Sequence, residues 1–470
     1  MKRRFLPAVL LATMMAVVPG LSCRRGEAVE RDPVETEAEE LLVRYLRIDT
    51  SNPPGNETRG ARFFKEIFDR EGIPSRLLGD DPNRQSIYVR LESKSDAPAL
   101  LLLHHLDVVP ADPSEWTVPP FEGRRANGYI WGRGALDIKS LGIAHLMSLL
   151  ELHRARVPLA RDVVFVAVAD EEAGGLRGAK PLLDAHPELF GDIGFVLNEG
   201  GATETVVDRV TWWGIEIDQK VPLWLRVVAR GHSGHGSLPP GDGGAPIALV
   251  RALAAIGEMT FPRQLTPSVE AHLRSVGEAK RPLDGRRPIL LDPAAYIDTP
   301  EIDTLPAGAR ALLQNTLVVS VLRAGSSVNV IPPTATAELD LRLVPGSDPA
   351  PVLASVRAAA GSAVDVDVIL AGAPVAPSPA DTPLFRMLAA LAVESSPGSK
   401  AGPYVSAGST DSRFFREKGK VAYGFNPFPV NYYDGATVHG ADERIRARFF
   451  SRGVRLMRRI VRQAATAAQL

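Results

Sequence analysis

The chain has 470 residues, of which 45% are apolar and 23% are charged, and its formal net charge is −1 at pH 7. This length exceeds the usual size of one hydrophobic core, so we expect two domains. The small net charge gives no support for nucleic acid or an anionic membrane surface as a general partner. The single cysteine, Cys23, excludes a disulfide within the chain and a thiolate metal site.

The amino-terminal residues have the pattern of a secretory signal. Three basic residues precede an apolar run over residues 5–18, and small residues then lead to Cys23. A run this short is typical of a cleaved signal, and an uncleaved membrane anchor is the alternative. Cys23 lies where a bacterial lipoprotein carries its lipid, although Gly20 replaces the usual leucine. We expect a signal over 1–23, a linker over 24–34, and a secreted or cell-envelope (periplasmic) protein that meets the membrane only through this signal or a lipid on Cys23.

The next part of the chain, residues 35–219, alternates between helical and strand patterns. Apolar strands that alternate with helices indicate an α/β sheet covered on both faces. Such sheets place their functional sites at the carboxyl ends of the strands. The apolar spacing predicts helices over 35–47, 60–71 and 141–153, and strands over 87–91, 99–103, 162–169 and 193–197.

The pattern changes after Lys220. The predicted elements then follow a β-α-β-β-α-β order, which is that of a ferredoxin-like module. The segment 261–314 is Pro-rich and weakly periodic, so we expect an insertion with little regular structure there. The predicted strands cover 223–229, 317–322, 334–343 and 364–370, and the predicted helices cover 245–259 and 352–360.

From residue 383 the pattern of the first domain resumes, and it ends in a long helix predicted over 443–467. The sequence therefore predicts an α/β fold in which a mixed sheet is sandwiched by helices. We expect this catalytic domain to consist of residues 35–219 and 374–470, interrupted by an inserted ferredoxin-like (βαββαβ) domain over residues 220–373.

Five residues of the metal-ligand type recur in separate motifs. Two histidines and three carboxylates can hold two zinc ions that share one carboxylate. Glycines beside the second motif let the backbone turn tightly, so that its carboxylate can reach both ions. The five are His105 in HHLDVVP, Asp137 in GRGALDIKS, Glu172 in ADEEAGG, Glu199 in LNEGG and His439 in ATVHGADE.

Two further carboxylates lie beside these ligands. Asp107 follows His105 by two residues and can accept the proton on its other ring nitrogen, which fixes the tautomer. Glu171 directly precedes Glu172 and suits a general base that takes a proton from a metal-bound water and passes it to the leaving nitrogen.

Each motif also has an ordinary structural interpretation. Asp107 could cap a turn beside a core histidine, Asp137 could lie in a simple turn, and residues 170–172 could form a solvated loop. Three adjacent carboxylates repel one another unless cations compensate, however, and their position after a buried strand favours metal. It is the ordered combination of motifs that is specific.

The motifs GHSGHGSLPP, SVNVIPP and GSTDSRFF accompany these five along the chain. Together they resemble the motifs of the di-zinc aminoacylase/carboxypeptidase metallopeptidase family, in family order from about residue 35 to the C-terminus. TLVVSVLRAG, over residues 316–325, is similar to the carboxypeptidase S and secreted N-fatty-acyl-amino-acid hydrolase branch. Ser140 departs from the usual glycine of the second motif.

The resemblance assigns roles to the metal-site residues. It implies two zinc ions, and N/O ligands of this kind also accept cobalt or manganese. It implies that Asp137 bridges the ions, that His105 and Glu199 complete one site, that Glu172 and His439 complete the other, that Glu171 is the general base and that Asp107 is the partner of His105.

The resemblance also assigns residues outside the metal cluster. His235 matches a lid histidine that polarises the scissile carbonyl and, in dimeric members, reaches the other subunit's active site. Asn329, Arg342 and Arg413 match positions near the substrate's carbonyl and carboxylate, where the planar fork of arginine binds a carboxylate through two parallel bonds. A surface salt bridge is the alternative for either arginine. The inserted domain would then serve as a lid and as the contact of a homodimer.

These residues lead to a functional prediction. We expect a zinc-dependent hydrolase that uses a metal-activated water to cleave an amide or peptide bond next to a free amino-acid carboxylate. Its substrate would be a peptide or an N-acyl amino acid. One alternative is a reversible N-fatty-acyl-amino-acid synthase/hydrolase. A non-catalytic binding protein is disfavoured, because the chain keeps all five ligands and Glu171.

Overall fold

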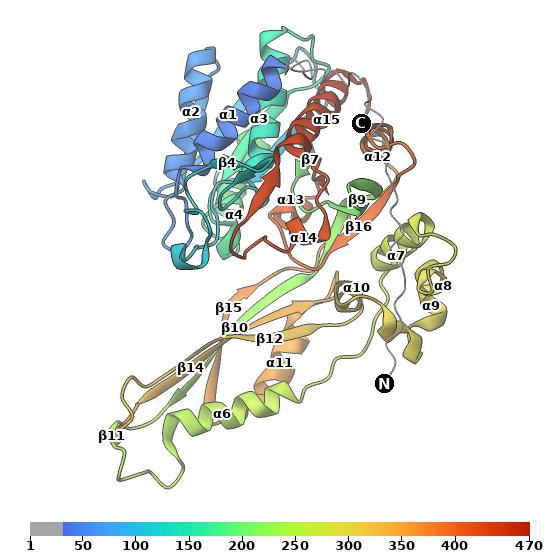
Figure 1. Ribbon diagram of the computed structural model, residues 1–470. Helices are drawn as coiled ribbons and strands as arrows, with labels where there is room; N and C mark the ends of the chain where they lie inside the picture. The colour runs from blue at the N-terminus through green and yellow to red at the C-terminus, as the bar shows by residue number, and fades with distance from the viewer. Residues whose placement is uncertain (1–31) are drawn as a thin grey trace, which may run out of the picture.

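The computed structural model describes residues 32–470. The expected signal and Cys23 lie outside these residues. Figure 1 shows a large lobe in which helices surround a sheet, and an elongated lobe that extends from it and is built on a second sheet. The prediction of an α/β fold with a mixed sheet between helices is confirmed.

The large lobe contains a nine-stranded mixed sheet with the order β1-β2-β6-β3-β7-β17-β9-β16, and β8 pairs with β9. The central strands β6, β3, β7 and β17 run parallel to one another, so their carboxyl ends meet at one edge. The strands are β1 (Ser75–Leu78), β2 (Ser86–Leu91), β3 (Ala99–His105), β6 (Val163–Val168), β7 (Ile193–Asn198), β8 (Ala202–Val206), β9 (Arg209–Gln219), β16 (Lys400–Ser406) and β17 (Val421–Gly424).

Helices cover both faces of this sheet, which explains why β6 (VVFVAV) is apolar and buried at every position. One face packs against α1, α2, α3, α12 and α15, and the other packs against α4, α5 and α13. Helix α1 begins where the side chain of Asp32 accepts a hydrogen bond from the backbone N–H of Val34. The helices are α1 (Pro33–Leu46), α2 (Thr58–Glu71), α3 (Lys139–Arg154), α4 (Ala179–Ala185), α5 (Pro187–Phe190), α12 (Pro383–Ser395), α13 (Ser412–Glu417), α14 (Tyr432–Gly435) and α15 (Ala447–Thr466).

The elongated lobe contains a four-stranded antiparallel sheet with the order β12-β14-β10-β15. Alternate residues of β14 are buried beneath α6 and α11, as a half-buried strand requires. The elements follow the predicted βαββαβ order, while the boundaries 220–373 stay a prediction. They are β10 (Val221–Arg230), α6 (Gly244–Gly257), β12 (Thr316–Ala324), β14 (Thr334–Leu343), α11 (Pro349–Ala360) and β15 (Val364–Ala371), with a small tip sheet of β11 (Gly234–His235) and β13 (Val330–Ile331).

The two lobes share one nearly continuous run of extended chain. Strand β9 of the large sheet ends at Gln219, and β10 of the second sheet begins at Val221, so that Lys220 alone separates them. The buried Lys220 Nζ donates to the backbone carbonyls of Ala311 and Gln314, at 2.7 and 2.9 Å. The junction is therefore fixed to the segment that precedes β12.

The expectation of little regular structure over 261–314 was wrong. This segment forms a series of helices that pack on β9 and β16 of the large sheet. Thr266 caps the first of them, and Val269, Leu273 and Val276 form its buried stripe. Prolines begin most of these short helices and interrupt the periodicity that would have revealed them. They are α7 (Pro267–Ala279), α8 (Arg287–Leu291), α9 (Pro293–Tyr296), the 3-10 turn η3 (Pro300–Thr304) and α10 (Ala307–Leu312).

A three-stranded sheet with the order β18-β5-β4 lies beside the large sheet. The predicted helix over 443–467 begins only at Ala447, because residues 444–446 pair with β5. Within residues 32–470, no helix is both long enough and apolar enough to cross a bilayer. The remaining elements are β4 (Arg124–Ala126), β5 (Tyr129–Trp131), β18 (Arg444–Arg446) and the 3-10 turns η1 (Pro113–Glu115) and η2 (Glu171–Ala173).

Candidate metal centre and active site

The five candidate ligands converge at the carboxyl edge of the parallel strands. His105 is the last residue of β3, Glu172 lies in η2 after β6, and Glu199 directly follows β7. Asp137 lies two residues before α3, and His439 lies in the loop before β18. This is the edge where an open α/β sheet carries its site.

Their side chains form two groups that share Asp137. The Oδ1 atom of Asp137 lies 3.2 Å from Nε2 of His105, and its Oδ2 atom lies 3.3 Å from Nε2 of His439. Glu199 is 3.7 Å from His105, and Glu172 is 3.3 Å from His439. Within each group of three, the ligand atoms all lie within 4.8 Å of one another, so each group could hold one ion. One carboxylate thus faces both positions.

The protonation of His105 fits a metal ligand. Its Nδ1 atom lies 2.9 Å from the backbone carbonyl of Asp107, which can only accept, so Nδ1 carries the proton. Nε2 faces the carboxylates of Asp137 and Glu199, whose charges raise the pKa of the ring and favour a proton on Nε2, which a bound cation would replace. A neutral imidazole oriented in this way is the usual form of a histidine metal ligand.

The charges of the cluster also fit bound cations. Burial raises the pKa of Glu172 to about 7, and one of its buried carboxylate oxygens has no hydrogen-bond partner in the described part of the chain. Burial likewise raises the pKa of Glu199. Hydrogen bonds to Asp137 and Glu172 raise the pKa of His439 to about 10. Protons are therefore held at positions where divalent cations would offset the same negative charge.

Asp107 acts mainly on the neighbouring backbone. Its carboxylate lies 3.5 Å from His105, farther than its own carbonyl does. The two carboxylate oxygens accept from the backbone N–H groups of Glu171 and Glu172, at 3.2 and 3.0 Å, and from Asn52 at 2.9 Å. Asp107 therefore fixes the turn that carries the candidate ligand Glu172.

Glu171 faces a cavity of about 270 Å³ that is also lined by Asp137, Glu172, Glu199 and His439. Burial, with a further contribution from the charge of Glu199, raises the pKa of Glu171 well above its usual value. A carboxylate with a raised proton affinity beside a ligand cluster can take and return a proton.

The two candidate substrate arginines meet at Ser409. Arg342 of β14 lines the cavity, donates from Nη1 to Ser409 Oγ at 3.1 Å and is held by Asp340. Arg413 also donates to Ser409 at 3.1 Å, but its other bonds go to backbone carbonyls, such as that of Gly174 at 2.6 Å. Arg413 is buried and does not line the cavity. Of the two, Arg342 is placed to meet a ligand.

His235 and Asn329 lie elsewhere within one chain. Both are at the tip of the elongated lobe, where β11 lies far from the large lobe (Figure 1). The backbone carbonyl of Asn329 accepts from Gly236 at 2.8 Å, and His235 Nδ1 accepts from Ser237. Both side chains are exposed and absent from the lining of the metal-site cavity.

Glu443 is a site residue that the sequence prediction missed. It is fully buried, and its carboxylate accepts from the backbone N–H groups of Gly134, Leu136 and Asp137, at 2.9, 2.7 and 3.0 Å. It also pairs with Arg133 at 2.7 Å. The loop that presents Asp137 is thus built around the carboxylate of Glu443. In the sequence, the one hint of this role was the position of Glu443 at the end of the motif VHGADE.

A second network missed from the sequence lies behind the turn after β6. Asn52 bonds to Asp107, and Arg84 pairs with Asp170 at 2.7 Å and with Glu57 at 2.8 Å. Asn52 lies in the Pro- and Gly-containing segment SNPPGNE, where no metal-ligand or catalytic pattern singled it out. These contacts position the carboxylates of residues 170–172.

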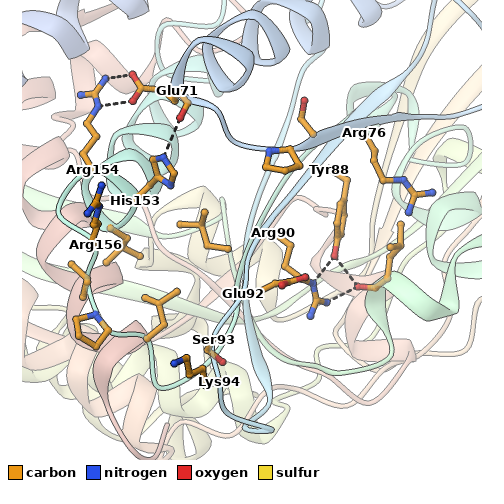
Figure 2. Close-up of a pocket in the computed structure, with 18 of the residues that line it drawn as sticks. Glu71, Arg76, Tyr88, Arg90, Glu92, Ser93, Lys94, His153, Arg154 and Arg156 are labelled. Carbon is orange, nitrogen blue, oxygen red and sulfur yellow. Dashed lines mark hydrogen bonds and ion pairs between the residues drawn. The ribbon is translucent and has the colours of Figure 1, made fainter.

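A larger hollow, of about 1360 Å³, lies away from this cluster along β2 and the end of α3 (Figure 2). Two of its arginines already have carboxylate partners: Arg90 pairs with Asp192 at 2.7 Å, and Arg154 pairs with Glu71 at 2.6 Å. None of the candidate ligands lines it. The candidate ligands line the smaller cavity instead.

The sequence model of peptidase family M20/M25/M40 matches residues 101–463. This chain belongs to that family. The match spans the five ligand motifs, Glu171 and the elongated lobe, so the resemblance drawn from the motifs is confirmed.

Relatives and solved structures agree with this membership. The chain is 28% identical over 447 residues to the N-fatty-acyl-amino acid synthase/hydrolase PM20D1 of Xenopus tropicalis, covering 90% of this chain and 85% of that protein. It is 27% identical to human aminoacylase-1, covering 92% and 96%. The fold is similar to the M20 family metallo-carboxypeptidase Sso-CP2 from Sulfolobus solfataricus, with a TM-score of 0.71, 21% identity and coverage of 91% and 98%.

Together the family and the cluster establish the reaction class. The chain is a metal-dependent hydrolase of amide bonds, as the motifs predicted. Its metal-binding character follows from the same observations, while the identity of the ion and of the substrate belongs to the proposal below.

Proposed function

We propose that this chain uses two zinc ions to hydrolyse the amide or peptide bond next to a free amino-acid carboxylate. The observation that carries this proposal is the position of Arg342. Among the described residues that line the metal-site cavity, it supplies the one guanidinium, and the other charged side chains are the carboxylates and His439. A planar guanidinium beside such a cluster suits a substrate whose carboxylate lies next to the scissile amide.

The roles of the surrounding residues follow from their positions. Bound zinc supplies Lewis acidity that lowers the pKa of a water and polarises a carbonyl. His105, Asp137 and Glu199 would hold one ion, and Asp137, Glu172 and His439 would hold the other. Glu171 would take the proton of the attacking water and return it to the departing nitrogen. Arg342, packed over Trp224 at 5.4 Å, would hold the substrate carboxylate.

The first test replaces Glu171 by Gln, which keeps the size of the side chain and removes its basicity. We expect the variant to retain about two ions per chain and to lose amide hydrolysis by roughly 10²- to 10⁴-fold. Metal analysis and steady-state kinetics measure both. The exposed Glu115→Gln serves as the control, and near-normal turnover of Glu171→Gln would remove Glu171 from the role of base.

The second test defines the substrate. Hydrolysis of dipeptides is compared with that of N-acetyl and N-long-chain-acyl amino acids, each with a free and an amidated carboxylate. We expect amidation to reduce kcat/KM for the preferred series, because Arg342 loses its partner. Equal rates on the free and amidated forms would contradict the carboxylate requirement.

A second candidate activity is the reverse reaction. The Xenopus relative is named a synthase as well as a hydrolase. The proton that Glu171 gives to the leaving nitrogen is one that it would take from an attacking amine in the opposite direction. Incubation of the enzyme with a fatty acid and an excess of free amino acid measures this activity directly.

We also propose that the chain is exported and retained at the bacterial envelope through a lipid on Cys23. The basic start, the short apolar run and the cysteine of residues 1–23 support this proposal. The mass of the mature protein and metabolic labelling with palmitate test it, with Cys23→Ser as the control. An unprocessed Met1 in the cell fraction would contradict it.

A further inference from the structure

A second cavity lies on the outer edge of the large lobe. It has a volume of about 270 Å³ and is enclosed by helices α7 and α10 on one side and by strands β9 and β16 on the other. Figure 1 shows these helices beside the edge of the sheet. Most of its lining therefore comes from segment 261–314 and from the strands that this segment covers.

This cavity is distinct from the metal-site cavity, and the two share a wall. Along the end of β16, Val405 and Ala407 line the outer cavity, whereas Ser406 and Gly408 line the metal-site cavity. Neighbouring side chains in an extended segment point to opposite faces, so the two cavities lie on opposite sides of one backbone segment. No described residue lines both.

The interior of the outer cavity is apolar. Leu273, Val276, Leu290 and Leu312 are each at most 8% exposed and line it. Trp212, His272 and Tyr404 pack edge-to-face as one aromatic wall, with ring centroids 5.1 to 6.2 Å apart. A concave apolar chamber with a few polar groups is the usual form of a small-molecule site.

The charged residues lie at the open end. Lys280, Glu204 and Arg286 line the cavity, and their side chains are 27%, 35% and 45% exposed. Lys280 pairs with Glu204, and Nε of Arg286 lies 3.5 Å from the Asp284 carboxylate, so each cation already has one carboxylate partner. The opening therefore presents two partly exposed cationic side chains, whose remaining N–H groups can donate to a ligand, in front of an apolar interior.

One polar atom inside the cavity lacks a partner. His272 is 7% exposed, and its Nδ1 atom has no hydrogen bond within residues 32–470. Burial lowers the pKa of this imidazole to about 4, so it is neutral at pH 7 and offers a hydrogen-bonding atom without adding charge.

We propose that this cavity binds an aliphatic chain that ends in a carboxylate, with the chain between α7 and β16 and the carboxylate at Lys280 and Arg286. Free fatty acids and N-acyl amino acids share this chemistry. Only N-acyl amino acids also carry an amide N–H, which could donate a hydrogen bond to His272. Such a ligand would occupy a site separate from the metal centre, and its binding does not depend on the proposed reaction.

Gly308 and Ala309 of α10 allow the cavity to be filled without disturbing the core. A Cβ atom added at Gly308 meets no heavy atom within 4 Å, and Ala309 is only partly buried. Binding of dodecanoate and of N-dodecanoylglycine to the metal-loaded protein is measured by calorimetry, for the wild type and for the Gly308→Trp and Ala309→Phe variants. We expect each filled variant to weaken binding of the ligand by at least about tenfold.

Three controls decide the outcome. His105→Ala disrupts the metal centre and should leave binding at the outer cavity intact. Lys280→Met should weaken binding of both carboxylate ligands by about tenfold. Lys180→Gln, which removes a lysine from another exposed ion pair, should leave their binding unchanged. Dodecanol, which lacks the carboxylate, should bind more weakly than dodecanoate.

The results distinguish the ligands and the sites. If N-dodecanoylglycine binds more tightly than dodecanoate, and His272→Phe removes this difference, the preferred ligand is an N-acyl amino acid. If the two bind equally, the cavity accepts any aliphatic carboxylate. Thermal unfolding first shows that both filled variants are as folded as the wild type. Binding that persists in these two variants but is lost in His105→Ala would overturn the proposal. Absence of binding by either ligand to the wild type would also overturn it.

Discussion

The imidazole of His105 illustrates how one contact defines a ligand. The carbonyl of Asp107 fixes the proton on Nδ1, so that Nε2 is available to an ion together with Asp137 and Glu199. Asp137, by contrast, faces both positions through its two oxygens. Loss of the histidine should therefore affect one position more than the other.

We accordingly predict that His105→Ala binds fewer ions than the wild type, which should hold about two per chain. Metal analysis of the dialysed protein measures the difference. His186→Ala is the matched control, because His186 also lies beside a carboxylate, Glu188, at 3.2 Å, but away from the cluster. Equal metal content in His105→Ala and the control would contradict the ligand assignment.

Asp107→Asn tests the turn that carries Glu171 and Glu172. An amide nitrogen cannot accept the hydrogen bonds that both carboxylate oxygens of Asp107 accept, so the turn should lose its orientation. We predict that kcat/KM falls roughly 10- to 100-fold. Kinetics of Asp112→Asn, which alters an exposed cap at Ser114, provides the comparison. Unchanged kcat/KM in Asp107→Asn would show that the turn holds without it.

At the residue scale, the candidate ligands could be predicted because each follows a recognisable strand or lies in a motif. The residues that position them could not. Glu443 bonds to a loop more than 300 positions earlier in the chain, and Asn52 reaches Asp107 across 55 positions. A buried carboxylate and a buried amide have no periodic pattern, so only the folded chain reveals their partners.

At the scale of elements, the loop before α3 depends on Glu443. Three backbone N–H groups and Arg133 converge on this carboxylate. Glu443→Gln replaces one oxygen by a donor and leaves Arg133 buried without its counter-charge. We predict that the free energy of unfolding falls by about 3 kcal/mol and that metal affinity falls with it.

Chemical denaturation and metal titration of Glu443→Gln measure these two quantities. The exposed Glu417→Gln should match the wild type in both. If Glu443→Gln were as stable as this control, the loop would be held by other contacts.

The elements with clear periodicity were predicted within a few residues, as β14 over 334–343 shows. Strand β9 was missed, because its buried residues include Glu216, a charged residue that argues against a buried strand. Glu216 is paired with Arg416, 200 positions later, at 3.0 Å. The helices of segment 261–314 were missed because most of them are short and begin at or next to a proline. Long-range pairing and element length, rather than local preference, decided both cases.

At the scale of the whole molecule, the position of His235 raises the question of how it could act. It lies at the exposed tip of the elongated lobe, away from the metal cluster of its own chain. The family resemblance implies that this histidine serves the other subunit of a dimer. Two inactive variants should then complement each other.

We predict that a mixture of His235→Ala and Glu171→Gln chains regains about a quarter of wild-type activity, because half of the dimers are mixed and each has one intact site. The subunits are mixed under dissociating conditions and assayed after reassembly, with each variant alone as the control. Activity no higher than that of either variant would place His235 in its own chain's site or outside the reaction.

The passage of β9 into β10 joins the two lobes through one run of extended backbone. Lys220 lies at the junction, and its Nζ donates to the backbone carbonyls of Ala311 and Gln314. Beside it, Pro222 accepts from Gly372 at 2.8 Å, which ties the returning chain to the same point. The chain that precedes β12 and the chain that follows β15 are therefore both tied to the point where β9 becomes β10. Strand β9 also carries Trp212 of the outer cavity, so one run of backbone connects that cavity to the elongated lobe.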